Sequence, residues 1–145
     1  MKRKRVLFLC TGNSCRSQMA EAMVNGLMGD VWEAESAGIS PTHIVHPLAL
    51  HVLAEINIET GRLYSKSVEP FRRTPFDFVI TVCDDAHENC PLWPGQGRIL
   101  HLGFPDPATA TGSEEEKLAV FRHVRDDIRA RVLSLLDQLA IATPE

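Results

Sequence analysis

A cysteine and an arginine stand at the two ends of a short polar loop near the N-terminus. Cys10 and Arg16 are separated by five residues, and Ser17 follows directly. A loop of this length between a strand and a helix can turn its backbone N–H groups toward a tetrahedral oxyanion, and the helix dipole adds positive potential there. The spacing therefore predicts an oxyanion-binding loop with a nucleophilic cysteine at its base.

The residues inside the loop suit this chemistry. Positive potential favours the thiolate form of Cys10, which is the nucleophile, and Ser17 is placed to donate a hydrogen bond to it. Arg16 can hold two oxyanion oxygens at once. The alternative is that Cys10 is only a buried thiol and Arg16 a surface residue. The predicted oxyanion-binding residues are Thr11, Gly12, Asn13, Ser14, Cys15 and Arg16.

Strands and helices alternate around this loop. A continuous apolar run predicts a buried strand at residues 6–10, and further strands are predicted at 31–37, 76–82 and 98–102. Helical spacing predicts helices at 14–28, 47–56 and 114–139, with Ser17 as the N-cap of the first and a helical turn at 65–68. This order predicts an α/β fold: a single domain over residues 1–145, with three layers (α/β/α) built on a four-stranded parallel sheet.

Three residues that could do chemistry follow predicted strands. Cys10 follows the first strand, Cys83 the third, and Asp106 comes shortly after the fourth. Ligands of parallel sheets bind beyond the carboxyl ends of the strands. The three residues are therefore expected to converge on one site.

Composition limits the classes of function. The chain has 145 residues, and its 15 Lys+Arg against 19 Asp+Glu give a formal net charge of −4, which disfavours a nucleic-acid binder. No apolar run approaches the ~20 residues of a membrane span, and the run behind the basic residues 2–5 is too short for a signal peptide. We expect a cytoplasmic monomer, in which four cysteines serve catalysis, redox chemistry or metal binding rather than structural disulfides.

Residues 10–17 resemble the signature loop of the low-molecular-weight protein tyrosine phosphatases and of the arsenate reductases that share their fold. The segment 35–38 and the pair Asp106-Pro107 extend the resemblance over almost the whole chain. In both groups the resemblance implies that Cys10 is the nucleophile, Arg16 holds the oxyanion, and Asp106 is the general acid for the leaving oxygen.

Two further cysteines distinguish the two groups. Cys83 and Cys90 lie seven positions apart in a polar segment that resembles the redox loop of thioredoxin-coupled arsenate reductases. The resemblance implies that Cys83 attacks Cys10 as arsenite leaves, and that Cys90 then attacks Cys83 to form a disulfide that thioredoxin reduces. Residues 107–110 also lack the aromatic wall of a phosphotyrosine cleft.

We therefore predict an arsenate reductase, with phosphate or sulfate as substrate mimics and weak residual phosphatase activity. Thioredoxin is the expected reductant, and glutaredoxin is the alternative. Cys15 has no part in the implied relay.

No tightly bound cofactor is expected, but the resemblance implies a potassium site beside the loop. Some reductases of this type bind potassium through a loop Asn, a helix Glu and a strand-end Ser, which match Asn13, Glu21 and Ser36. The further Asp ligand of the family has no clear match near Ser65. The alternative is that Asn13 hydrogen-bonds the loop and that Glu21 simply favours the helix N-terminus.

A zinc-binding module is a different alternative, because the chain has four cysteines and His87 lies between two of them. Structural zinc sites usually pair cysteines two to four residues apart, whereas six residues separate Cys83 from Cys90. Zinc would also leave Arg16 and Asp106 without a role.

Overall fold

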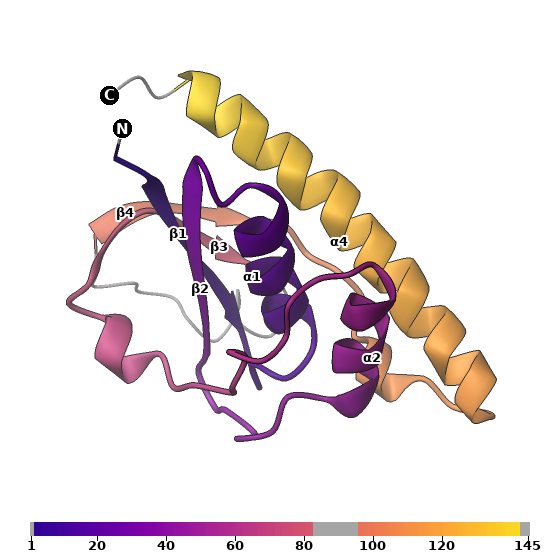
Figure 1. Ribbon diagram of the computed structural model, residues 1–145. Helices are drawn as coiled ribbons and strands as arrows, with labels where there is room; N and C mark the ends of the chain where they lie inside the picture. The colour runs from indigo at the N-terminus through magenta and orange to yellow at the C-terminus, as the bar shows by residue number, and fades with distance from the viewer. Residues whose placement is uncertain (1, 83–95, 143–145) are drawn as a thin grey trace.

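The computed structural model describes residues 2–82 and 96–142 and shows helices packed on a parallel sheet (Figure 1). The four-stranded sheet has the order β2-β1-β3-β4, and every neighbouring pair is parallel, which confirms the predicted sheet. The strands are β1 (Lys4–Cys10), β2 (Trp32–Gly38), β3 (Pro75–Thr81) and β4 (Gln96–His101).

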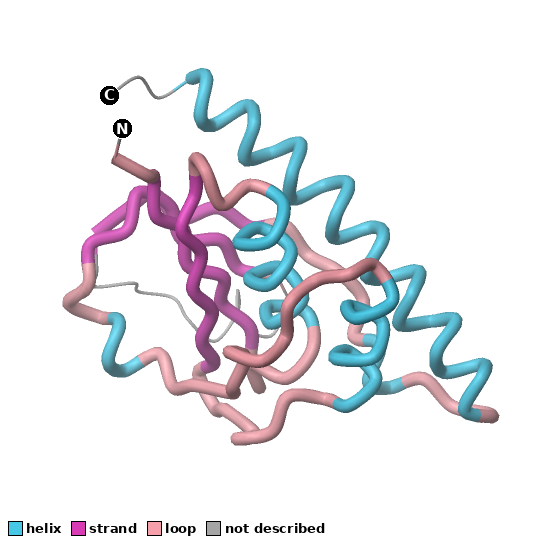
Figure 2. Tube along the Cα trace, in the orientation of Figure 1, coloured by secondary structure: helices cyan, strands magenta, loops and turns pink. Residues whose placement is uncertain are grey.

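Among the residues that the structure describes, the α-helices lie on one face of the sheet (Figure 2). They are α1 (Arg16–Leu27), α2 (Pro47–Glu55) and α4 (Glu114–Ala142). The opposite face packs on the segment that contains the 3-10 helix η1 (Glu69–Phe71), through Val68 and Phe71. Both faces of β1 are therefore buried, which is why its sequence reads as a continuous apolar run.

The last helix anchors this layer through one apolar stripe. Its fully or nearly buried residues recur at helical spacing and pack on the core that contains α1 and α2. The stripe consists of Leu118, Phe121, Val124, Ile128, Val132 and Leu136. Leu136 is fully buried in this stripe, whereas its neighbour Leu135 is only partly buried. Among the described residues, no helix combines the length and the hydropathy needed to cross a membrane.

Two local predictions are wrong. Ser17 is not an N-cap: it lies buried in the first turn of α1, and the cap position is Cys15, which makes no side-chain capping hydrogen bond. The helical turn predicted to open at residues 65–68 is displaced: it begins at Glu69 as η1, with Val68 as its N-cap. Ser67 instead bridges to Gly38 at the end of β2, because hydrogen bonds from the sheet override the local preference. The remaining predicted elements are present with shifted ends.

Candidate oxyanion-binding site

The polar loop joins the end of β1 to the start of α1. Cys10 is the last residue of β1 and is buried, and Arg16 is the first residue of α1. Gly38 lies beside the loop because β2 is the parallel neighbour of β1. A side chain at Gly38 would meet the carbonyl oxygen of Thr11 at 2.7 Å, so only glycine allows this close approach.

The carbonyl groups of the loop are held from outside. The carbonyl oxygens of residues 11–14 accept hydrogen bonds at 2.9–3.1 Å. Because each peptide unit is planar and trans, the N–H group of the following residue points the opposite way. The N–H groups of residues 12–15 are thereby turned toward the inside of the loop, as an anion cradle requires. The donors outside are the backbone N–H groups of Ser40, Thr42 and His46 and the side chain of Gln18.

Arg16 brings the positive charge of the site. Its Nη1 donates to the carbonyl oxygen of Phe104 at 3.0 Å, and its Nη2 lies 3.7 Å from Asp106 Oδ2. Its Nε is buried and has no hydrogen-bond partner among the described residues. A buried donor without a partner costs free energy, and a bound oxyanion would supply the missing acceptor.

Asp106 reaches the same site from the segment after β4. Its Oδ1 accepts a hydrogen bond from the backbone of Ala108 at 2.9 Å, which caps the 3-10 helix η2 (Pro107–Thr109). The other carboxylate oxygen faces Arg16, and the side chain is 38% exposed. The structure therefore brings Asp106 to the loop, and its role as general acid stays a prediction.

Cys15 lies inside the loop with its thiol buried. Burial, and then the negative charge of Asp106, raise the pKa of Cys15 to about 12, against 9.0 for an ordinary thiol. The raised pKa favours the neutral thiol at physiological pH, and the absence of Cys15 from the relay stays a prediction. Cys83 and Cys90 lie outside the described residues.

The sequence matches the low molecular weight phosphotyrosine protein phosphatase family over residues 5–143. The chain belongs to that family. Within the family it is similar to arsenate reductases, as predicted from Cys83, Cys90 and residues 107–110: it is 45% identical to the arsenate reductase of Halalkalibacterium halodurans, with 91% of this chain and 94% of the relative covered.

Solved structures agree with this placement. An arsenate reductase in the phosphate binding state superposes with a TM-score of 0.75 at 30% identity, covering 94% of this chain and 99% of the other. The thioredoxin-dependent arsenate reductase of Corynebacterium glutamicum gives a TM-score of 0.68 at 26% identity, covering 97% of this chain and 64% of the other.

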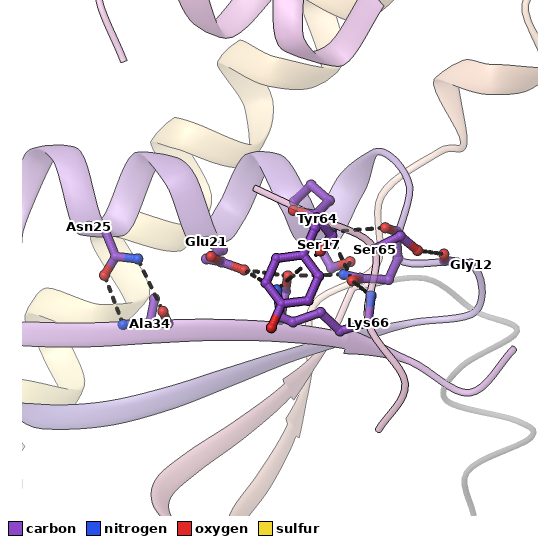
Figure 3. Close-up of polar contacts among 11 residues, drawn as sticks. Gly12, Ser17, Glu21, Asn25, Ala34, Tyr64, Ser65 and Lys66 are labelled. Atoms are coloured by element: carbon purple, nitrogen blue, oxygen red, sulfur yellow. Dashed lines mark hydrogen bonds and ion pairs between the residues drawn. The ribbon is translucent and has the colours of Figure 1, made fainter. Parts of the chain in front are cut away.

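Behind the loop, this family member carries a buried polar cluster that includes Asn13, Glu21 and Ser36. Figure 3 shows Glu21 of this cluster on α1. The side-chain amide of Asn13 donates to Ser36 Oγ at 2.9 Å and to Ser17 Oγ at 2.8 Å. Ser36 Oγ in turn donates to Glu21 Oε1 at 2.5 Å. The three residues predicted from the resemblance are thus in contact, and Ser17 accepts a hydrogen bond here. Its predicted hydrogen bond to Cys10 stays a prediction.

Sequence reasoning missed one member of this cluster. Lys66 is buried, and its ammonium lies 3.2 Å from Glu21 Oε1. No periodicity in the sequence distinguishes this lysine from a surface lysine, since two serines flank it. Among the described residues, no group of three or more His, Cys, Asp or Glu side chains is arranged to hold a metal ion.

Proposed function

We propose that the protein reduces arsenate to arsenite, with Cys10 as nucleophile and with Cys83 and Cys90 as the redox relay. The observation that carries the proposal is the loop itself. Its inward N–H groups and the unpartnered Nε of Arg16 form a cradle for a tetrahedral oxyanion above a buried cysteine. The similarity to arsenate reductases selects arsenate among such oxyanions.

The first step forms a bond between Cys10 and arsenic. The Cys10 thiolate attacks arsenate, and an oxygen leaves as water after Asp106 supplies a proton. Arg16 and the loop N–H groups stabilise the negative charge that develops on the remaining oxygens. Because Asp106 already faces Arg16, the acid and the clamp approach the substrate from the same side.

The second stage transfers two electrons to arsenic. The Cys83 thiolate attacks the Cys10 sulfur, the electron pair of the sulfur–arsenic bond stays on arsenic, and arsenite leaves. Cys90 then attacks Cys83, which frees the Cys10 thiolate and forms a Cys83–Cys90 disulfide. A dithiol such as thioredoxin reduces this disulfide. The relay needs a reducing compartment, which supports a cytoplasmic location.

The test is arsenate turnover coupled to NADPH oxidation through thioredoxin and thioredoxin reductase, with a glutaredoxin system run in parallel. Cys10→Ser should abolish arsenate reduction. Cys83→Ser should abolish turnover while still allowing oxyanion binding. Turnover with glutaredoxin alone would reject the thioredoxin assignment, and full turnover by Cys83→Ser would reject the relay.

A weak phosphatase activity is the second candidate, because the oxyanion loop and the acid are shared within the family. Water would hydrolyse a phosphocysteine at Cys10 without any further thiol. Cys83→Ser should therefore retain hydrolysis of an aryl phosphate while losing arsenate reduction. Equal loss of both activities in this variant would contradict the division of roles.

A further inference from the structure

An ion pair lies buried directly behind the oxyanion loop. Lys66 and Glu21 are each 7% exposed, and the Lys66 ammonium is 3.2 Å from Glu21 Oε1. The ammonium also donates to the carbonyl oxygen of Tyr64 at 3.2 Å and lies 4.5 Å from the centre of the Tyr64 ring. Figure 3 shows Glu21 on α1, with Lys66 and Tyr64 beside it. One buried positive charge is thus matched to one buried negative charge.

The same cluster contains the residues that the family resemblance assigns to potassium. A monovalent cation would need the free lone pairs of these oxygens. In this chain the oxygens accept hydrogen bonds instead. Asn13 Oδ1 accepts from the backbone N–H of Lys66 and from Gln18, both at 2.8 Å. Glu21 Oε1 accepts from Lys66 and Ser36.

The charge of the cluster also disfavours a bound potassium ion. Glu21 is the carboxylate of the predicted potassium site, and the Lys66 ammonium already lies within ion-pair distance of it. A potassium ion among these ligands would lie beside the ammonium and be repelled by it in a region of low dielectric constant. The residues present therefore do not fit a bound potassium ion.

We propose that the Lys66 ammonium is a built-in cation that replaces potassium in this chain and holds the oxyanion loop in its binding shape. The connection runs from Lys66 through Glu21 and Ser36 to Asn13, and returns through the hydrogen bond from the Lys66 backbone to Asn13. Asn13 has a positive φ of 49°, so its conformation depends on these partners. Lys66 acts through Asn13 and is a positioning residue.

The proposal rests on the oxyanion site of the proposed function but not on its redox chemistry, so the test uses no arsenate. Thermal unfolding and sulfate binding are measured in potassium, sodium and choline chloride at equal ionic strength. The wild type should show the same melting temperature and sulfate affinity in all three salts. A saturable rise of either quantity that is specific to potassium would overturn the proposal. A chain that binds sulfate this way and fails to reduce arsenate would overturn only the proposed function.

Substitution of Lys66 should create a potassium requirement. Lys66→Asp adds an oxygen ligand and removes the ammonium, so potassium should raise its melting temperature and strengthen its sulfate binding relative to choline. In choline its sulfate affinity should be about 5- to 150-fold weaker than that of the wild type, the range typical of coupled sites. Lys2→Met removes an exposed lysine and should change neither quantity. If Lys66→Asp bound sulfate in choline chloride as tightly as the wild type does, the positioning role would be refuted.

A neutral pair keeps the test informative if single variants unfold. Lys66→Met leaves the Glu21 carboxylate buried without its partner and should lower the melting temperature strongly. Adding Glu21→Gln removes that charge and keeps a hydrogen-bond acceptor for Ser36. The double variant should recover stability and sulfate binding, with no response to potassium. Failure of the second substitution to recover stability would show that Lys66 acts through packing and not through its charge.

Discussion

Cys15 should react with iodoacetamide at about pH 8 roughly a thousandfold more slowly than an ordinary cysteine of equal access. Burial, followed by the charge of Asp106, raises the pKa of Cys15 from 9.0 to about 12. Only the thiolate reacts, and each pKa unit lowers the thiolate population about tenfold at a pH below both values. A difference of about three units therefore gives the thousandfold factor.

The assay is timed alkylation between about pH 7 and pH 10, with modification of each cysteine followed by peptide mass spectrometry. The logarithm of the Cys15 rate should rise linearly across the whole range. Burial also blocks the reagent sterically, but steric blocking lowers the rate without moving the titration. A rate that levels off near pH 9 would refute the electrostatic reasoning, even if the reaction were slow. Asp106→Asn should lower the pKa of Cys15 and speed its alkylation.

Three further predictions have measurable outcomes. Asp106→Asn should slow the single-turnover reaction with arsenate by about 10²–10⁴-fold, with a smaller loss of oxyanion binding, as expected for a general acid. Ile128→Ala, fully buried in α4, should lower the free energy of unfolding by about 2–5 kcal/mol, whereas Ile141→Ala, 83% exposed, should change it by less than about 0.5 kcal/mol in urea titrations. Arg122 holds the pKa of Glu55 at about 2 in the folded protein, against 4.5 for an ordinary glutamate. The ionised carboxylate therefore stabilises the folded state at a pH above about 4.5, and this stabilisation is lost as the pH falls toward about 2. The urea midpoints of wild type and Glu55→Gln should accordingly converge over this pH range.

The fold could be predicted from the sequence wherever the burial of a strand is visible in its own run of residues. β1 is buried on both faces over residues 6–10 and β3 over residues 78–80, so each strand contains a continuous apolar run. The parallel order then follows from strands alternating with helices. Residues 65–68 could not be predicted in the same way. The bridge between Ser67 and Gly38 comes from hydrogen bonds between Gly38 and the backbone of Lys66 and Val68, which join segments far apart in the sequence.

The residues of the site likewise fall into those that local sequence predicts and those that it does not. Cys10 and Arg16 were predictable because their spacing within one loop carries the chemistry. Lys66 was not, because a lysine between two serines has the composition of a solvated loop. Its burial depends on Glu21, which lies 45 residues earlier in the chain. Contacts of this kind appear only once the sheet has brought α1 and residue 66 together.

The wrong N-cap prediction for Ser17 has a physical explanation in the function of the loop. A serine at the cap would accept hydrogen bonds from the first N–H groups of α1 through its side-chain oxygen, and would so compete with an anion for them. In the structure Ser17 Oγ instead accepts a hydrogen bond from Asn13, inside the first turn, and Cys15 at the cap makes no side-chain capping hydrogen bond to the helix. The N-terminus of α1 is thereby left for an oxyanion, whose charge the helix dipole favours. The first N–H groups of α1 lack a side-chain cap in the protein alone, and we expect a bound oxyanion to accept their hydrogen bonds.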